Sequence, residues 1–308
     1  MRALVTGGAG FIGSHVAEAL LAEGHEVVVL DDLSTGNRAN VPAGATFLEG
    51  SLLDAALVKK ACEGVDVVVH HAAQTSVSVS VRKPILDAQV NVVGGVELLE
   101  AAAAAGAKRF VFASTGGAIY GDVPDGRSAS LGDPARPESP YACSKLAFEG
   151  YLGMAQASGR MATVVLRYAN VYGPRQDPHG EAGVVAIFLQ RMLAGEPIQV
   201  NARKAAGDDG CVRDYVSVAD VVRANLMAVA GEFDGETIHV CTGEGTTTRR
   251  LAEVLLALTE SESEVRDGDP RAGDVERSVL SVDSRLAPEH SLEDGLRAAA
   301  EWFRGKAG

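Results

Sequence analysis

A glycine-rich turn at the very start of the chain most constrains the fold. Residues 2–5 are predicted as a buried strand and residues 14–22 as a helix, with Gly7, Gly10 and Gly13 between them. Glycine at these positions permits the tight turn, the close approach of backbone to a pyrophosphate, and the close packing of helix on strand. The helix N-terminus then directs unpaired N–H groups toward phosphate oxygens. The segment predicts a dinucleotide site, and a glycine turn without a ligand is the simpler alternative.

An acidic residue after the second strand indicates which dinucleotide is bound. Residues 26–30 are predicted as a strand, and Asp31 follows directly. A carboxylate at this place accepts hydrogen bonds from both adenosine ribose hydroxyls and repels a ribose phosphate. The expected cofactor is therefore NAD rather than NADP.

The rest of the first half alternates β-rich and helical runs, which is typical of a doubly wound parallel sheet. We therefore predict an α/β fold, a Rossmann-type doubly wound parallel sheet with a smaller α/β substrate-binding lobe. Further strands are expected at residues 46–49, 66–70, 109–113 and 162–167, and helices at 54–62, 85–105 and 141–157.

The local composition changes after residue 170, where loops rich in Gly, Pro and Asp begin. We expect an NAD-binding domain over residues 1–170, with return segments around 214–242, and a lobe over 171–308 that mainly binds substrate. Helices are expected at residues 184–194, 218–229, 249–258 and 292–303, and strands at 197–200 and 237–241.

Composition excludes several partner classes. The net charge of −13 disfavours nucleic acid, which is held by surplus Lys and Arg. Four cysteines without paired spacing indicate a reducing cytoplasm. No leader is recognised, and no apolar run reaches the ~20 residues that span a bilayer, so no membrane association is expected. His70 and His71 lack an acid or cysteine at ligand spacing, so packing near the cofactor is expected rather than a metal site.

Tyr141 and Lys145 are the candidates for proton transfer. Residues four apart on a helix share a face, so both side chains can point into one cleft. A nearby ammonium and a cationic nicotinamide both favour the phenolate of a tyrosine. Thr115, after the strand at 109–113, can hydrogen-bond the reacting oxygen. A solvated helix face is the alternative for the Tyr-Lys pair.

Several segments of the chain resemble the extended short-chain dehydrogenase/reductase family, and within it the nucleotide-sugar epimerases of the UDP-glucose 4-epimerase type. The resemblance covers essentially the whole length. It is carried by the glycine loop, residues 31–36, His71-Ala72-Ala73, Asn91, residues 114–121, 141–145 and 166–175, Arg213-Asp214-Tyr215-Val216, and Arg271-Ala272-Gly273-Asp274.

This resemblance extends the expected NAD site to strand ends across the sheet. The expected cofactor-binding residues are Gly7, Gly10, Phe11, Ile12, Gly13, Asp31, Asp32, Ser34, Thr35, Gly36, Ser51, Leu52, His71, Ala72, Ala73, Asn91, Ser114, Tyr141, Lys145 and Tyr168.

For the substrate, the resemblance implies a UDP-sugar. Arginines in an acidic chain suit a diphosphate, although each alone could form a surface ion pair. Asp274 is expected at a uridine ribose and Asn170 at the sugar or its phosphates. The expected substrate-binding residues are Thr115, Tyr141, Asn170, Val184, Arg213, Arg271, Asp274 and Ser278.

The implied activity is inversion at C4 of a UDP-hexose through a transient 4-keto sugar. Related 4,6-dehydratases carry an Asp-Glu pair after the threonine, whereas this chain has Gly116-Gly117-Ala118-Ile119. A dehydratase or a UDP-glucuronate decarboxylase or epimerase is the enzymatic alternative, and an NAD-sensing regulator the non-enzymatic one. Counting back from Tyr120 would put Gly116, not Thr115, at the catalytic hydroxyl.

Two finer expectations concern substrate breadth and assembly. Ser278 corresponds to the position where a bulky tyrosine excludes N-acetyl groups, so N-acetylhexosamines are expected as substrates beside glucose and galactose. The sequence leaves uronic acids and dTDP-sugars open. The helices at 85–105 and 141–157 are expected to pair with their copies in a homodimer.

Overall fold

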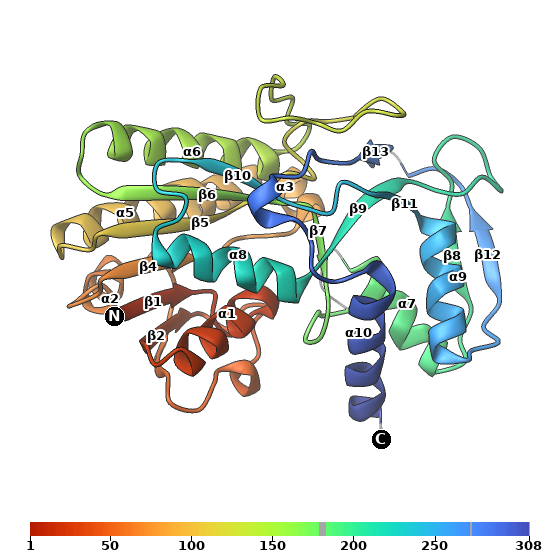
Figure 1. Cartoon of the computed structure of the whole chain (residues 1–308), viewed down its shortest axis with the longest axis horizontal. Coiled ribbons are helices and arrows are strands. Elements are labelled where there is room, and N and C mark those ends of the chain that lie inside the picture. Colours follow the sequence, from red (N-terminus) through yellow and green to blue (C-terminus); the bar gives the residue numbers. More distant parts are fainter. Residues whose placement is uncertain (179–182, 272, 308) are drawn as a thin grey trace. The chain divides into compact units, whose positions relative to one another are not determined.

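A computed structural model of the chain describes residues 1–178, 183–271 and 273–307 (Figure 1). It divides into two compact units. Unit 1 contains Met1–Thr115, Ser139–Arg167 and Val221–Ile238, and unit 2 contains Gly116–Glu138, Tyr168–Asp220 and His239–Gly308. Residues 116–138, which the sequence analysis expects in the first domain, thus belong to unit 2, and the segment that returns to unit 1 is 221–238.

A seven-stranded parallel sheet forms the centre of unit 1, which confirms the predicted fold class. The strand order is β10-β6-β5-β4-β1-β2-β3. Successive strands are therefore added toward one edge up to β3 and toward the other edge from β4 onward, so the order switches between β1 and β4. The strands are β1 (Arg2–Thr6), β2 (Glu26–Asp31), β3 (Thr46–Glu49), β4 (Val67–His70), β5 (Arg109–Thr115), β6 (Ala162–Tyr168) and β10 (Thr237–Val240).

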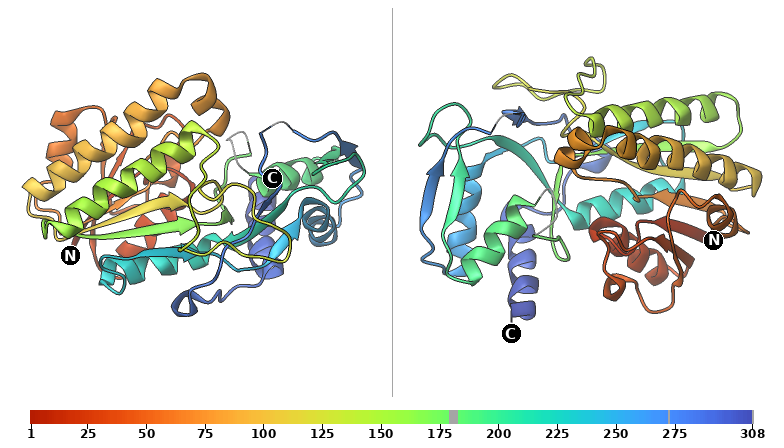
Figure 2. Two further views of the ribbon diagram at one scale, coloured as in Figure 1. Left: turned by 90° about the horizontal axis from the view of Figure 1, so that it is seen from above. Right: turned by 180° about the vertical axis from the view of Figure 1, so that it is seen from behind.

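Helices cover both faces of this sheet, which is why its central strands are apolar throughout. Figure 1 shows α5 and α6 over one face and α1 and α8 over the other, and Figure 2 shows α5 and α6 side by side. The helices are α1 (Phe11–Ala22), α2 (Ala55–Ala61), α3 (Val77–Arg82), α4 (Pro84–Ala88), α5 (Gly95–Ala104), α6 (Pro140–Ala157) and α8 (Val218–Ala230).

The core beneath α5 and α6 is aromatic. Phe112 and Phe148 lie edge to face with ring centroids 4.8 Å apart, and Phe110 contacts Phe148 at 6.0 Å. His70 is buried among these rings and is stacked on Phe112 at 5.6 Å. Burial lowers the pKa of His70 well below its usual value, with Lys145 acting in the same direction. His70 is therefore a neutral packing residue, as expected.

The helix expected over residues 85–105 is interrupted. A π-helical turn, η2 (Gln89–Gly94), separates α4 from α5. The amide of Asn91, inside this turn, is hydrogen-bonded to Gln74 and Asp87 rather than exposed on the helix surface. Such turns occur frequently at functional sites, and apolar periodicity alone does not reveal them.

Unit 2 packs three helices against short strands. The helices are α7 (Val184–Leu193), α9 (Thr248–Thr259) and α10 (Leu292–Ala307), and the strands are β7 (Asn170–Tyr172), β8 (Ile198–Asn201), β9 (Val212–Ser217), β11 (Gly245–Thr247), β12 (Val265–Gly268) and β13 (Arg277–Ser278). Short 3₁₀ turns lie at Arg38–Asn40 in unit 1 and Ser284–Leu286 in unit 2.

Strand β9 organises this unit, since β7, β11 and β13 all pair with it. The sequence analysis expected β8 and the helices but missed β7, β9, β11, β12 and β13. Within the described residues, no helix combines the length and apolarity that crossing a bilayer requires.

Candidate active site

The loop between β1 and α1 has the backbone that a dinucleotide needs. Gly7 has a φ of +70°, and a Cβ there would lie 2.6 Å from the backbone nitrogen of Ala72. A Cβ at Gly13 would lie 2.3 Å from the carbonyl oxygen of Gly7. At Gly10 a Cβ would meet only that same oxygen, at 3.1 Å, so the protein leaves the outer side of this turn open. The loop therefore fits a pyrophosphate against bare backbone at the start of α1.

Asp31 ends β2 beside this loop. Its carboxylate accepts hydrogen bonds from the backbone N–H of Ala9 at 3.0 Å and of Leu33 at 2.9 Å. Burial raises the pKa of Asp31, the two backbone hydrogen bonds oppose this, and Asp32 adds to the rise. The carboxylate oxygens are fixed in place and retain lone pairs for ribose hydroxyls.

Leu33 has a backbone conformation that the sequence analysis did not predict. Its φ of +57° is unusual for a residue with a branched side chain. This conformation lets its N–H reach Asp31 and leads the chain into Ser34, Thr35 and Gly36. Outliers of this kind concentrate at ligand sites.

The other expected cofactor residues also lie at the carboxyl ends of sheet strands, where ligands of such sheets bind. Asp32, Ser34 and Thr35 are exposed after β2, and Gly36 contacts Asp31 closely enough that a Cβ would lie 2.8 Å from its Oδ1. Ser51 and Leu52 follow β3, and His71, Ala72 and Ala73 follow β4. Phe11 and Ile12 open α1, Ser114 lies in β5, and Tyr168 ends β6 within unit 2.

The side chain of Asn91 is buried and hydrogen-bonded to other protein groups. Its Oδ1 accepts from the Gln74 N–H at 2.8 Å, and its Nδ2 donates to the Gln74 carbonyl at 2.9 Å and to Asp87 Oδ1 at 3.1 Å. The side chain is 3% exposed. Asn91 therefore holds the backbone that follows Ala72 and Ala73.

Tyr141 and Lys145 lie together, as expected, on the first turns of α6. Ser139 caps this helix by accepting from the Ala142 N–H at 3.2 Å, and Pro140 occupies its first turn. The ammonium of Lys145 lies 5.9 Å from the centroid of the Tyr141 ring and donates to the Ala113 carbonyl at 2.9 Å. The pair is thus fixed against the end of β5.

The electrostatics of this pair differ from the expectation. Burial raises the pKa of Tyr141, and the Asp87 carboxylate acts in the same direction. Burial lowers the pKa of Lys145 to about 8, opposed by Asp87 and Glu149. The surrounding protein therefore disfavours the phenolate. The two influences expected to favour the phenolate, the nearby Lys145 ammonium and a cationic nicotinamide, must therefore act against this burial.

Thr115 is the last residue of β5 and is half-buried. At the next residue a Cβ on Gly116 would lie 2.3 Å from Leu280 Cδ1, so a side chain there would displace this buried leucine. Gly116 instead donates its N–H to the Tyr168 carbonyl at 2.7 Å. The hydroxyl available at this end of β5 is that of Thr115.

In unit 2, three expected substrate residues lie on paired strands around Gly117. Arg213 in β9 is the register partner of Ser278 in β13. A Cβ at Gly117 would lie 3.2 Å from Asn170 Oδ1 and 3.9 Å from Ser278 Oγ. Ser278 is only 3% exposed, so its small side chain faces the protein interior. Val184, also expected at the substrate, begins α7.

Arg213 is held by its strand rather than by an acid. Among the described contacts, its guanidinium donates to the Val212 carbonyl at 3.0 Å, and it has no ion pair. The adjacent Asp214 is buried and accepts hydrogen bonds from the N–H groups of Thr242, Gly243 and Leu280 and from the Thr242 hydroxyl. Sequence reasoning gave Asp214 no role, and its role here is to fix β9.

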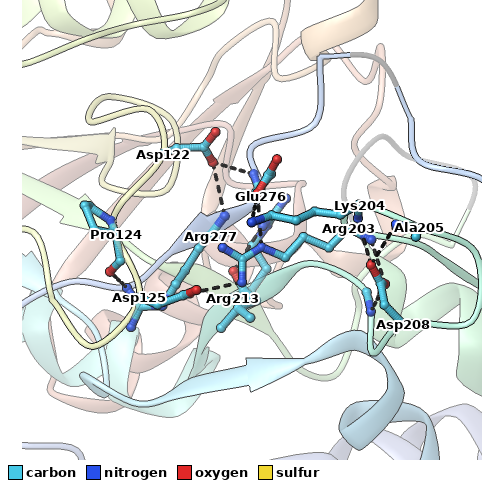
Figure 3. A network of polar contacts seen from close by, with 12 residues as sticks. Asp122, Pro124, Asp125, Arg203, Lys204, Ala205, Asp208, Arg213, Glu276 and Arg277 are labelled. Atoms are coloured by element: carbon cyan, nitrogen blue, oxygen red, sulfur yellow. Dashed lines mark hydrogen bonds and ion pairs between the residues drawn. The ribbon is translucent and has the colours of Figure 1, made fainter.

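Around β13, Figure 3 shows that other arginines carry the ion pairs. Arg203 binds Asp125 at 3.0 Å and Glu276 at 3.2 Å. Arg277 donates to the Pro124 carbonyl at 2.9 Å, and Asp122 accepts from its backbone N–H at 3.2 Å. The Arg277 guanidinium also pairs with Asp125, with Nε 3.8 Å from Oδ1. Arg203 and Arg277 thus have carboxylate partners, whereas none is described for Arg213.

Arg271 and Asp274 lie in an exposed turn closed by the Asp274 N–H and the Arg271 carbonyl at 3.3 Å. With the Asn201 amide oriented to satisfy its neighbours, its oxygen accepts from Arg271 Nε at 2.8 Å and Nη2 at 3.2 Å. Arg271 and Asp274, both expected to bind the substrate, are thus accessible to it. Ala272 lies outside the described residues.

Comparison with known proteins agrees with this geometry. Residues 3–241 match the NAD dependent epimerase/dehydratase family. The chain belongs to this family. NAD is thus its cofactor, as the glycine loop and Asp31 predicted.

Members of the NAD dependent epimerase/dehydratase family resemble the chain over its whole length. UDP-glucose 4-epimerase of Mycolicibacterium smegmatis is 42% identical over 320 aligned residues, which cover 100% of both chains. The structure of UDP-glucose 4-epimerase from Thermus thermophilus in complex with NAD has a TM-score of 0.94 at 51% identity and 99% coverage of both chains. That of the Thermotoga maritima enzyme with UDP-glucose has a TM-score of 0.94 at 44% identity and complete coverage.

Proposed function

We propose that the chain is an NAD-dependent UDP-hexose 4-epimerase. The single observation that carries the proposal is the Tyr141–Lys145 pair at the end of β5, in the unit whose β1–α1 loop and Asp31 fit NAD. Full-length relatives named UDP-glucose 4-epimerase support this activity. An NAD-sensing regulator would need the cofactor loop but not the pair.

In this mechanism Tyr141 takes the proton from the 4-hydroxyl of the hexose and later returns it to the inverted centre. Lys145 holds a ribose hydroxyl of the cofactor and supplies positive charge beside the phenol, and Thr115 hydrogen-bonds the reacting oxygen. Bound NAD supplies a hydride acceptor that is regenerated within the cycle, and its positive charge favours the phenolate. The overall reaction is redox-neutral and yields an isomer.

Dehydration and decarboxylation are disfavoured by the residues after Thr115. Elimination of a hydroxyl needs an acid that protonates the leaving group. Gly116 and Gly117 carry no side chain, and the nearby carboxylates of Asp87 and Glu149 are occupied by internal hydrogen bonds. The residues directly after Thr115 thus supply no acid for elimination, which favours reduction of a keto sugar back to a hexose.

We assign the nucleotide end of the substrate to unit 2. Arg213 and Arg271 bind the diphosphate, Asp274 a uridine ribose hydroxyl and Asn170 the sugar or its phosphates. Arg213 supports this assignment because it has no carboxylate partner among the described contacts, while its neighbours Arg203 and Arg277 both pair with Asp125. Guanidinium groups suit bidentate binding of phosphate.

The proposal is tested by incubating the NAD-loaded protein with a panel of UDP- and dTDP-hexoses and separating the epimers by chromatography. We expect UDP-glucose and UDP-galactose to interconvert with no change in mass. Tyr141→Phe should lower the rate roughly 10²- to 10⁴-fold and leave NAD bound. A product lighter by one water, or full activity of Tyr141→Phe, would overturn the proposal.

Acceptance of N-acetylhexosamines is part of this proposal. Ser278 lies near Gly117 and Asn170, and its side chain occupies less volume than a tyrosine would at this position. We expect UDP-GlcNAc to be epimerised, and Ser278→Tyr to lose that activity while keeping UDP-glucose turnover. Rejection of UDP-GlcNAc by the unaltered chain would contradict this expectation.

We also propose that the protein is a cytoplasmic homodimer. Packed helices α3, α4 and α6 of unit 1 expose Val81, Ile85 and Met154, at 61%, 73% and 54% of their surface. We assign the interface to these exposed apolar side chains, since contiguous apolar surface is typical of protein–protein contact sites. The four cysteines are free thiols, which suits a reducing compartment.

A further inference from the structure

We propose that Asp87 is a positioning residue for the Tyr141–Lys145 pair, an inference that rests on the proposed function. Its carboxylate ties three segments of unit 1 to one point: the start of α6, the π turn after α4 and the loop after β4.

The first argument is the set of hydrogen bonds. Oδ2 of Asp87 accepts from the Ser144 hydroxyl at 2.6 Å. Oδ1 accepts from Gln74 Nε2 at 2.8 Å and from Asn91 Nδ2 at 3.1 Å. All three partners are donors, so the group acts only as an acceptor, which is what an ionised carboxylate does. Asp87 is 0% exposed, so water cannot replace these partners.

The second argument is the identity of the three partners. Ser144 lies in the same helical turn as Tyr141 and directly precedes Lys145. Asn91 and Gln74 hold each other through both backbone groups of Gln74, next to the loop residues Ala72 and Ala73. One buried carboxylate therefore fixes the helix that carries the proton-transfer pair relative to the segment expected to line the cofactor.

The third argument is charge. Asp87 raises the pKa of both Tyr141 and Lys145, although burial is the larger cause for each. The other titratable groups that act on Lys145 are Glu149, one turn further along α6, and His70 and His71 at the end of β4. Burial lowers the pKa of His71 to about 3, and that of His70 also falls, so both are neutral and the carboxylates determine the local field.

Two variants and a control separate the effect of the Asp87 charge from that of its hydrogen bond to Ser144. Asp87→Asn removes the charge, Ser144→Ala removes one hydrogen bond and keeps the charge, and Glu100→Gln alters an exposed carboxylate paired with Arg160. Each NAD-loaded protein is checked by circular dichroism, and kcat and KM for UDP-glucose are measured as a function of pH.

For Asp87→Asn, both limbs of the rate profile should move about one pH unit toward acid, because loss of a negative charge lowers the pKa of base and ammonium alike. Ser144→Ala should lower kcat about tenfold with an unchanged KM and an unmoved profile. Glu100→Gln should match the unaltered chain. A purely structural aspartate would change stability without moving the profile.

The inference is overturned if folded, NAD-loaded Asp87→Asn keeps the original profile and kcat. Should Asp87→Asn fail to fold, Ser144→Ala decides, and an unaltered kcat in that variant overturns the inference. These outcomes leave the proposed function intact, since the unaltered chain and Tyr141→Phe test it separately. An unaltered chain without epimerase activity would overturn the proposed function and this inference together.

Discussion

The proton-transfer side chains are unusual because burial and charge act against each other on them. Lys145 is 4% exposed yet must remain an ammonium to support a neighbouring phenolate. Burial alone disfavours its charge, and the carboxylates of Asp87 and Glu149 partly restore it. The two nearby acids therefore help to keep Lys145 charged in this buried position.

A pH dependence follows from this balance. The pKa of Lys145 is lowered to about 8, so the side chain is mostly charged at neutral pH and loses its charge as the pH rises through that value. We expect kcat/KM for UDP-glucose to fall on the alkaline side with a midpoint near this pKa. A rate that stays constant through mildly alkaline pH would show that the ammonium is not required.

Asp31 gives a second prediction for a single side chain. Asp31→Asn removes the charge that accepts two ribose hydroxyls, and hydrogen bonds to charged groups contribute about 1.5–3 kcal/mol. We expect NAD affinity to fall roughly tenfold or more and the preference over NADP to narrow, both measurable by fluorescence titration. Undiminished NAD affinity would place the adenosine ribose elsewhere.

Among the elements, the β1–α1 loop has backbone too close to Gly13 for a side chain to fit there. In Gly13→Ala the new Cβ would lie 2.3 Å from a backbone oxygen that cannot move without distorting Gly7. We expect a loss of about 1–3 kcal/mol in the free energy of unfolding and loss of NAD binding. The control, Gly305→Ala in α10, has no heavy atom within 4 Å of its Cβ and should stay within about 0.5 kcal/mol in denaturant titrations. Equal effects of the two substitutions would refute the close-approach argument.

The elements also show how far sequence reasoning reaches. Buried parallel strands such as β1 and β4 are continuous apolar runs, and their helices have clear periodicity, so the sheet of unit 1 was predictable. The two-residue β13 and the other short strands on β9 carry no such pattern, because pairing partners distant in sequence decide them. The π turn around Asn91 and the role of Asp87 depend on a buried hydrogen-bond network that periodicity cannot detect.

At the scale of the whole molecule, two separate units contribute to one proposed reaction. Unit 1 carries the NAD loop and the proton-transfer pair, while unit 2 carries the arginines proposed for the diphosphate. The motifs of both units could be recognised in the sequence. Only the structure showed that Arg203 and Arg277 form ion pairs while Arg213, among the described contacts, forms none.

The exposed apolar face of α3, α4 and α6 gives a prediction about assembly. Ile85→Glu places a charge at the most exposed of these side chains, and burying an unpaired charge in an interface is costly. We expect light scattering after gel filtration to give a dimer for the unaltered chain and a monomer for Ile85→Glu. A monomeric unaltered chain would exclude the homodimer, and a variant that stays dimeric would move the interface to another face.

Isotope retention at C4 tests the central claim most directly. UDP-glucose carrying deuterium at C4 is converted by the NAD-loaded protein, and the products are examined by NMR and mass spectrometry. A redox-neutral inversion returns the same hydrogen, so we predict UDP-galactose that keeps deuterium at C4 and has the mass of the substrate. Deuterium lost to water, or a product lighter by one water, would contradict the account.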